Sequence, residues 1–406
     1  MLIDFSCSNV RSIKDNVTLN LKASNDDEFS HTLIDANEEK ILPACTIYGS
    51  NATGKTSILT ALSLMQNIVN SSHVFQPGDL LPRIPHRLLQ NKETSFCINY
   101  IWKNIKFKYE FTYTENEILK EFLYYSPNGR ISKIFERNKL SIKYSDKFTK
   151  IDTLCKDKLQ PNKLVLSLAA NNLNYEEINS AFLFFKEGLV ILLNDNNNWL
   201  DYSASQLEHS KAIKDIFLKF LQENTGSDIK DIKAKTEIKV PTAADIPQDL
   251  PAEIKALILS KPTRFTRIET IYNGFKLDIT EESMGTQKLI RLICPLIDIL
   301  QNDKTFLCDE IESHLHPLIV RQVISRFMTD KSSKAQIICA THDIELLDLS
   351  IFRRDQIWFT DLNPDFHRTR LYSLNSLGCR KDDNIQKKYL ESKYCNVPSG
   401  FWNHKN

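Results

Sequence analysis

One segment decides the fold: Gly49-Ser50-Asn51-Ala52-Thr53-Gly54-Lys55-Thr56 matches the pattern GxxxxGK(S/T). The residues before it, Ile41–Tyr48, are mostly apolar and predict a short buried strand. After it, apolar side chains recur at helical spacing from Ile58 to Val69. Strand, glycine-rich turn and helix are the parts of a phosphate-binding loop, in which backbone N–H groups and the helix N-terminus attract anions.

The loop pattern also assigns individual roles. Lys55 is expected to neutralise the β- and γ-phosphates of a nucleotide, and the Thr56 hydroxyl is expected to hold Mg²⁺. Glycine is scarce, with ten in 406 residues against a usual share of about 7%, so each glycine is expected where only glycine fits. From the roles of Lys55 and Thr56, the predicted cofactors are ATP and Mg²⁺.

A second motif, Thr305–Glu310, reads as an apolar strand that ends in two acids. At the strand end, Asp309 is expected to complete the Mg²⁺ shell. Glu310 is then placed to polarise an attacking water molecule. Taken alone, the motif fits an exposed acidic turn equally well.

Two further features raise the weight of the acidic motif. The run Glu282–Gln287 contains SxGxQ before an apolar stretch, so a serine hydroxyl and a glycine N–H at a helix start form a second anion site. A spare anion site indicates contact with the γ-phosphate of a neighbouring copy. Downstream, the apolar strand Ala335–Thr341 precedes His342, which is placed to sense a γ-phosphate. Considered alone, Ser283 is best explained by a role as a helix cap, and His342 by a place in a loop.

The order GSNATGKT, SMGTQ, TFLCDE and THD resembles the ABC-type ATPase heads of the SMC, RecF and OLD group. The start Met1–Ser12 resembles the opening strand and turn of that group, with Val10 where the group usually has an aromatic residue. Leu315-His316-Pro317 resembles an element of the OLD-like branch. The tail resembles stand-alone ATPases of abortive-infection operons, such as those of PARIS phage-defence systems and those paired with RloB-like proteins. The resemblance covers 1–70 and 262–406 well and the middle loosely.

This resemblance implies an α/β fold: a P-loop ABC-type ATPase head with an antiparallel β subdomain and a helical insertion. It implies an ATPase that assembles as a homo-oligomer, at least a dimer, through ATP held between copies. Glu310 would be the catalytic base, His342 the switch, Asp309 and Thr56 the metal ligands, and Arg11 a nucleotide contact. The remaining implied nucleotide contacts, in the same or the neighbouring copy, are Gly49, Asn51, Ala52, Thr53, Gly54, Lys55, Ser57, Ser283, Gly285 and Gln287. The Q-loop glutamine has two candidates, Gln76 and Gln90.

The expected domains are a discontinuous nucleotide-binding core at 1–93 and 262–406, an antiparallel β subdomain at 94–150, and a mainly helical insertion and linker at 151–261. Side chains alternate from Phe96 to Trp102 and from Ile105 to Tyr113, with Asn104 at the turn, which predicts half-buried antiparallel strands. The spacing predicts that residues 151–225 are mostly helical, for example over Leu207–Glu223. Four prolines within 241–262 predict a connector with a short helix, and Thr263–Ile279 returns to strand spacing.

Composition excludes several classes of protein. With 52 Lys+Arg against 51 Asp+Glu, the net charge of +1 argues against coating nucleic acid through bulk charge. A basic stretch, Arg130–Lys150, fits a nucleic-acid or acidic-partner contact, or the solvated face of a hairpin pair. Nine cysteines without a CxxC pair argue against zinc knuckles and disulfides and for a reducing cytoplasm. No apolar run approaches the roughly 18 residues of a membrane span, and no signal peptide is recognisable.

The leading functional hypothesis is an ATPase that senses a phage-derived trigger and regulates a separately encoded effector, a nuclease-type toxin. The short tail after His342 predicts that chemistry other than ATP hydrolysis comes from another protein. The alternative is a RecF- or SMC-like ATPase that acts directly on DNA in repair or recombination. A nucleotide-binding scaffold with negligible hydrolysis and a self-contained nuclease are weaker alternatives.

Overall fold

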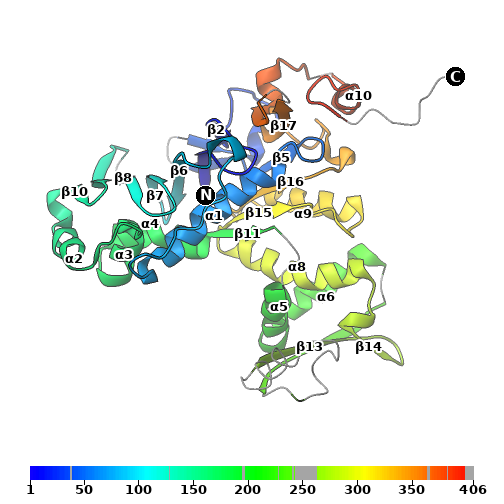
Figure 1. Ribbon diagram of the computed structural model, residues 1–406. Helices are drawn as coiled ribbons and strands as arrows, with labels where there is room; N and C mark the ends of the chain where they lie inside the picture. The colour runs from blue at the N-terminus through cyan, green and yellow to red at the C-terminus, as the bar shows by residue number, and fades with distance from the viewer. Residues whose placement is uncertain are drawn as a thin grey trace. The chain divides into compact units, whose positions relative to one another are not determined.

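The computed structural model describes residues 1–36, 39–127, 129–193, 197–226, 228–239, 242, 263–363, 366–381 and 383–397. The chain divides into two compact units (Figure 1). The first unit contains Met1–Asn194, Leu300–Glu312 and Val320–Asn406, and the second contains Asp195–Ile299 and Ser313–Ile319. The glycine-rich loop and the acidic end of the predicted strand Thr305–Glu310 both lie in the first unit.

The first unit contains a six-stranded, mostly parallel sheet in the described part of the chain, with the order β11-β15-β16-β5-β17-β18. Only the edge strand β18 runs antiparallel to its neighbour. In the central strands, Cys308 lies opposite Cys339 and Ala340 opposite Ile47. The predicted segment Ile41–Tyr48 forms two strands instead of one, because Pro43 separates β4 from β5. The bounds are β4 Glu39–Ile41, β5 Ala44–Tyr48, β11 Leu189–Leu192, β15 Thr305–Asp309, β16 Gln336–Ala340, β17 Ile357–Asn363 and β18 Arg368–Ser373.

A buried side chain pins the register of this sheet. The Gln336 amide donates to the carbonyl oxygens of Leu2 and Leu42, both at 3.0 Å. Its amide oxygen accepts from the Leu2 N–H at 2.5 Å and from the Thr305 hydroxyl at 3.1 Å. Since Gln336 is fully buried, these bonds replace water, and a one-residue slip of β16 would leave the amide unsatisfied.

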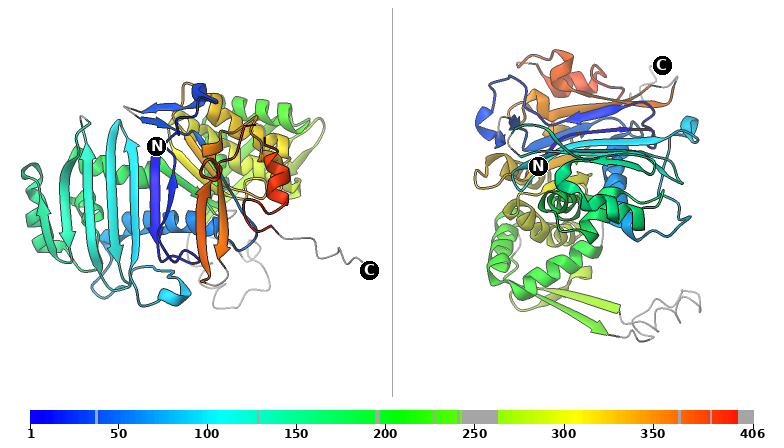
Figure 2. Two further views of the ribbon diagram at one scale, coloured as in Figure 1. Left: turned by 90° about the horizontal axis from the view of Figure 1, so that it is seen from above. Right: turned by 90° about the vertical axis from the view of Figure 1, so that its left-hand side faces the viewer.

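A seven-stranded antiparallel sheet, counted over the described residues, has the order β10-β9-β8-β7-β6-β1-β2, and the left-hand view of Figure 2 shows its strands side by side. The predicted alternation is confirmed from Phe96 to Tyr100 and from Phe107 to Tyr113, but Ile101 is also buried and Trp102 is only half-buried. Positive φ angles at Lys103 and Asn104 make the predicted tight turn. The bounds are β1 Leu2–Ser8, β2 Val17–Asn20, β6 Thr94–Trp102, β7 Ile105–Tyr113, β8 Ile118–Ser126, β9 Ser132–Asn138 and β10 Ser141–Tyr144.

Helices cover one face of this antiparallel sheet (Figure 2). The Tyr100 hydroxyl donates to the carbonyl of Ala181 at 2.8 Å, which ties β6 to the helical layer. The Gln66 side chain donates to the carbonyls of Phe185 and Leu189 and joins α1 to the start of β11. The helices of this unit are α1 Lys55–Ser71, α2 Lys150–Lys158, α3 Val165–Asn172, α4 Glu176–Leu183 and α10 Ile385–Leu390.

The second unit combines helices with a three-stranded antiparallel sheet of the order β12-β13-β14 among its described residues. The segment Leu207–Glu223, predicted to be helical, is helical except at Ser210. The helix breaks at Ser210, whose hydroxyl accepts from the Ile213 N–H and caps a new helix. The elements are α5 Asn197–His209, α6 Lys211–Thr225, β12 Asp231–Lys239, β13 Thr263–Ile271, β14 Lys276–Asp278 and α8 Met284–Gln301, and α9 Pro317–Thr329 spans both units.

The two units do not coincide with the expected domains. The strands expected at 94–150 belong to the first unit, because β6 pairs with β1 along its length. Within the segment expected to be mainly helical, Leu189–Leu192 forms β11, the parallel edge strand beside β15. The expected connector at 241–262 lies outside the described residues except for Thr242. Among the helices described, none is both long and apolar enough to cross a membrane.

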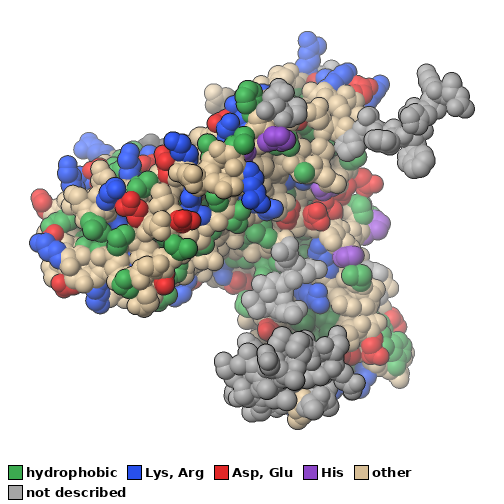
Figure 3. All heavy atoms as spheres, in the orientation of Figure 1, with side chains coloured by type: hydrophobic (Ala, Val, Ile, Leu, Met, Phe, Trp, Pro, Cys, Tyr) green, Lys and Arg blue, Asp and Glu red, His purple; other side chains and the backbone are tan. Residues whose placement is uncertain are grey.

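The basic stretch does not form a continuous cationic surface. Arg137 is buried and pairs with the buried Glu121 at 3.3 Å. Its guanidinium also donates to the carbonyls of Lys163, at 2.5 Å, and Gln160, at 3.3 Å. Three further members, Lys133, Lys139 and Lys147, have carboxylate partners, and Figure 3 shows acidic and basic side chains mixed on the visible face of this region. The structure favours the solvated-face interpretation.

Replacing Arg137 by Met is expected to lower the free energy of unfolding by about 3–5 kcal/mol, because the Glu121 carboxylate then stays buried without its counter-charge. Urea unfolding followed by circular dichroism measures the change. The control Lys139→Met removes the exposed pair with Glu117 and is expected to cost less than about 1 kcal/mol. Equal losses for the two variants would contradict the assigned role of Arg137.

Candidate functional site

One cavity of the first unit collects most of the predicted site residues. It has a volume of about 360 Å³, which lies in the usual range for small-ligand sites. The cavity opens where β5, β15 and β16 end, because parallel strands in register release the residues after them at one edge of the sheet. Its lining residues are Arg11, Ser12, Asn51, Ala52, Gly54, Lys55, Thr56, Ser57, Asp309, Glu310 and His342.

The glycines of the loop stand where a side chain does not fit. Gly54 has a φ of +111°, and a Cβ there would lie 2.2 Å from the Thr369 hydroxyl and 2.9 Å from the Ser12 hydroxyl. Gly49 has a φ of +154°, and a Cβ there would lie 2.3 Å from the Thr360 hydroxyl. Backbone conformation and close contact therefore both require glycine at these two positions.

Lys55 begins α1 and is buried, with its ammonium turned back onto the loop. Its Nζ donates to the carbonyls of Gly49 at 2.7 Å and Ser50 at 3.2 Å. Burial lowers the pKa of Lys55, and the nearby carboxylates of Asp309 and Glu310 oppose that shift. A buried ammonium in a loop whose residues line the cavity is suited to an anionic ligand.

The two acids at the end of β15 are held differently. Burial raises the pKa of Asp309, against a hydrogen bond from the Thr56 hydroxyl and the charge of Lys55. Glu310 leaves the strand with a left-handed φ of +49°, and its N–H donates to the carbonyl of Ala340 at 2.9 Å. The backbone of a non-glycine residue is strained in that conformation, and such strained residues are common at functional sites.

His342 follows the end of β16 and is an exposed residue whose imidazole is only partly shielded from solvent. Its backbone N–H donates to the Glu312 carboxylate at 2.7 Å, which links the residue to the turn after Glu310. Partial desolvation and the charge of Lys55 lower the pKa of the imidazole, while Glu312 and Glu310 oppose the shift. The imidazole is therefore biased towards its neutral form, in which one nitrogen accepts and the other donates a hydrogen bond.

Sequence reasoning missed the hydroxyl groups that hold the loop. The Thr369 hydroxyl, on β18, donates to the carbonyl of Thr53 at 2.9 Å and contacts the Ser12 hydroxyl at 2.8 Å. Ser12 in turn contacts the Ser57 hydroxyl at 2.8 Å. On β17, the Thr360 hydroxyl meets that of Thr53 at 2.7 Å. Single threonines more than 300 positions away carry no recognisable sequence signal.

Arg11 lies on the rim of the cavity in a left-handed turn with a φ of +51°. Its guanidinium donates to the Thr60 hydroxyl at 3.0 Å, and its N–H donates to the carbonyl of Ile84 at 2.7 Å. The guanidinium thus rests on the first turns of α1. The Q-loop candidates Gln76 and Gln90 are not among the described residues that line the cavity.

The predicted second anion site belongs to the second unit. Ser283 is exposed before α8, and its hydroxyl accepts from the Thr286 N–H at 3.2 Å, as expected for a helix cap. A Cβ on Gly285 would lie 2.9 Å from the carbonyl oxygen of His314. The Gln287 amide donates to the carbonyl of Glu282 at 2.9 Å, so within one chain it supports the turn before its own helix.

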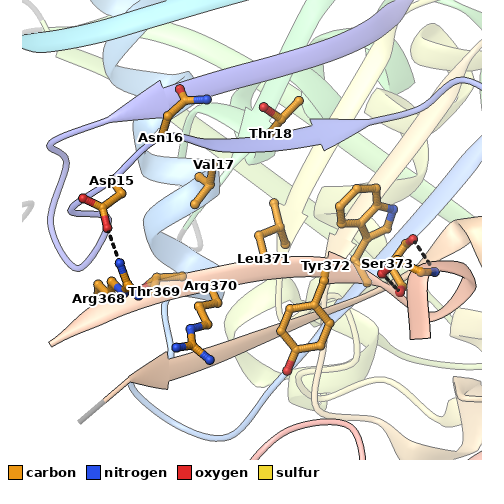
Figure 4. A pocket seen from close by; sticks show the side chains of 12 residues that line it. Asp15, Asn16, Val17, Thr18, Arg368, Thr369, Arg370, Leu371, Tyr372 and Ser373 are labelled. Carbon is orange, nitrogen blue, oxygen red and sulfur yellow. Dashed lines mark hydrogen bonds and ion pairs between the residues drawn. The ribbon is translucent and has the colours of Figure 1, made fainter. Parts of the chain in front are cut away.

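A larger cavity of about 520 Å³ lies between β18 and the segment that leads into β2, and Figure 4 shows Val17 and Leu371 pointing towards each other across it. An ion pair between Arg368 and Asp15, at 2.7 Å, closes one end. None of the predicted site residues lines this cavity. Size alone therefore does not identify the site, and the smaller cavity has the convergent lysine, acids and loop amides.

A family model described as "AAA domain, putative AbiEii toxin, Type IV TA system" matches residues 46–348, about three quarters of the chain. The chain belongs to this AAA_21 family. It is therefore a P-loop member of an ATPase family, and the match contains both the glycine-rich loop and the acidic strand end. The family match and the two sheets agree with the predicted α/β P-loop ATPase fold.

Solved structures similar to the AAA_21 chain include SMC head domains. The head from Thermotoga maritima has 10% identity and a TM-score of 0.41, with 92% of this chain and 98% of that chain covered. A head bound to the C-terminal domain of ScpA, from Pyrococcus furiosus, has 11% identity and a TM-score of 0.40, with 93% and 97% covered. These values are low, so the fold rests on the strand order given above. No curated protein matches the chain.

Gly54→Ala is expected to lower the free energy of unfolding by about 2–6 kcal/mol, because backbone strain adds to the clash with Thr369 and Ser12. Gly78→Ala is the matched control: Gly78 has a φ of +90°, but no described atom lies within 4 Å of its Cβ position. It is expected to cost only the strain, about 1–3 kcal/mol. Denaturant unfolding measures the free energy of unfolding of both variants. Equal losses would show that the Thr369 and Ser12 hydroxyls move aside without an energetic cost.

Proposed function

We propose that the AAA_21 chain binds and hydrolyses ATP with Mg²⁺, assembles through ATP held between two copies, and regulates a separate effector in antiphage defence. One observation carries the proposal: Lys55, Thr56, Asp309 and Glu310 line a single cavity at the ends of three adjacent parallel strands. A cation, a metal-binding hydroxyl and two acids beside loop amides are the parts that phosphoryl transfer needs.

In this proposal the loop amides and Lys55 hold the phosphates, and the α1 N-terminus adds its positive potential. The Thr56 hydroxyl and the Asp309 carboxylate fit a hard cation, because they lie within hydrogen-bonding reach of each other and Asp309 is partly desolvated. No cluster of three His, Cys, Asp or Glu able to hold a metal exists among the described residues. Mg²⁺ suits this arrangement, since it usually keeps water and substrate phosphate as ligands. Glu310 orients water, and His342 contacts the γ-phosphate.

The charge of the cavity supports assembly around the nucleotide. Lys55 and Arg11 are balanced by Asp309 and Glu310, while the imidazole of His342 is biased towards neutrality. A Mg²⁺–ATP complex keeps net negative charge, so additional donors stabilise it. The exposed helix start at Ser283 and Gly285 of a second copy is the proposed source. ATP then favours the closed assembly because its γ-phosphate contacts both copies, and hydrolysis removes that difference.

The defence role is supported by the family description, which names a toxin–antitoxin system, and such a system pairs two proteins. The resemblance to ATPases of PARIS and RloB-associated operons points to a separate nuclease-type effector and a phage-derived trigger. A RecF-like action on DNA has less support, because the basic stretch contains the buried Arg137 and acid-paired lysines. ATP-dependent and salt-dependent DNA binding by the purified chain would favour that alternative.

Lys55→Ala is expected to abolish measurable ATP binding, because the buried ammonium is the main positive charge at the phosphates. Titration with a fluorescent ATP analogue measures the affinity, and the loss should exceed about 100-fold, given roughly 1.5–3 kcal/mol for each charged hydrogen bond. Lys139→Ala, which changes an exposed lysine far along the chain, serves as the control. Undiminished affinity in Lys55→Ala would remove the proposed nucleotide site.

Glu310→Gln is expected to keep ATP binding, block turnover and accumulate the closed assembly. The amide fills the same space but cannot take up the proton of the attacking water, and loss of such a base lowers rates by about 10²–10⁴-fold. Phosphate release measures turnover, and sedimentation with ATP measures assembly. Turnover at the wild-type rate would show that another group is the base.

A further inference from the structure

The turn before α8 is fixed by a residue outside the SxGxQ motif. Glu282 immediately precedes Ser283, and one oxygen of its carboxylate accepts two hydrogen bonds from β13 and the turn that follows it. The Tyr272 hydroxyl donates at 2.8 Å, and the Thr270 hydroxyl donates to the same oxygen. Thr270 is fully buried, so its bond is not exchanged freely with water.

The backbone of Glu282 is held as firmly as its side chain. Its carbonyl oxygen accepts from the Gln287 amide at 2.9 Å, and its N–H donates to the carbonyl of Ile279 at 3.2 Å. The preceding residues form a capping box, in which Asp278 accepts from the Thr280 N–H and Glu281 accepts from the Asp278 N–H. Glu282 therefore joins the β13–β14 hairpin to the first turn of α8.

The backbone position of Glu282 determines where two neighbouring residues lie, Ser283 and Gly285, which are the proposed phosphate contacts. Ser283 caps the helix, so its hydroxyl direction follows the backbone at Glu282. Gly285 lies close against the backbone of His314, because a Cβ there would be 2.9 Å from the His314 carbonyl oxygen. A shift of the backbone at 282 would move both the Ser283 hydroxyl and the Gly285 N–H, and small displacements strongly weaken preorganised anion contacts.

We propose that Glu282 is a positioning residue, which uses the hydroxyls of Thr270 and Tyr272 to aim Ser283 and Gly285 at the γ-phosphate held by a second copy. This inference rests on the proposed function. It assigns no contact with nucleotide to Glu282 itself. Its consequence is specific: disturbing Glu282 weakens the step that joins two copies and leaves the Lys55 cavity of each copy intact.

The test compares variants of the full chain by their dependence on protein concentration. Glu282→Ala is expected to raise the concentration that gives half-maximal ATP turnover by about tenfold, as expected for the loss of hydrogen bonds to a charged, partly buried group. Affinity for a fluorescent ATP analogue, measured in dilute protein, should change by less than about twofold, because the Lys55 cavity is untouched. Glu282→Gln keeps an acceptor oxygen for both hydroxyls and should restore near wild-type behaviour.

A matched control separates positioning from general loss of stability. Ser203→Ala removes the hydrogen bond at 3.1 Å that the hydroxyl of the buried Ser203, on α5, donates to the Arg291 carbonyl of α8 within the same unit. It should lower the unfolding midpoint without changing the concentration for half-maximal turnover. The inference is overturned if Ser203→Ala shifts that concentration as much as Glu282→Ala, or if Glu282→Ala behaves like wild type. Wild-type turnover that does not depend on protein concentration would overturn the proposed assembly, and this inference with it.

Discussion

The candidate site depends on the register of three parallel strands. Because β15, β16 and β5 are paired residue by residue, Asp309 lies opposite Ala340, and Ala340 lies opposite Ile47. The residues after each strand therefore leave the sheet at one edge, where they meet around one cavity. Gln336 supports this register from the opposite end of β16, since its buried amide is satisfied only by partners on other segments. Chemistry at one edge of the sheet is thus secured by polar contacts at the other.

The loop itself is shaped by side chains distant in sequence. A glycine-rich turn can adopt several backbone conformations by itself. Thr360 and Thr369 contact this turn from β17 and β18 and restrict it to one of them. Their hydroxyls fill the space in which a Cβ on Gly49 or Gly54 would lie. Replacing these glycines therefore disturbs a hydroxyl network as well as the backbone. The loop is built into the sheet, which limits the ordering entropy that a bound anion has to overcome.

Sequence patterns within a few residues predicted the elements that depend on neighbouring residues. The features that the sequence did not predict depend on contacts with residues distant in the chain. The glycine-rich loop, its helix, the hairpin at Asn104 and the apolar strand before Asp309 follow from spacing within a few residues. Leu189–Leu192 read as helical because its strand character comes from pairing with β15, more than 100 residues away. Arg137 read as part of a charged surface because its partner Glu121 is on a neighbouring strand. The roles of Glu282 and Thr369 depend on contacts that have no pattern in the sequence.

The two halves of the proposed ATP pocket belong to different units of the chain, and each is stabilised within its own unit. Lys55 is paired with loop carbonyls, and the Ser283 turn is tied to a hairpin by Glu282. Since neither half has to fold around the nucleotide, in the proposed assembly the free energy of binding the γ-phosphate is available for bringing a second copy into contact. A phosphate must replace the bonds from Lys55 to Gly49 and Ser50, which reduces affinity for a single copy. The proposed assembly requires this relation, in which two copies hold the nucleotide more tightly than one copy does.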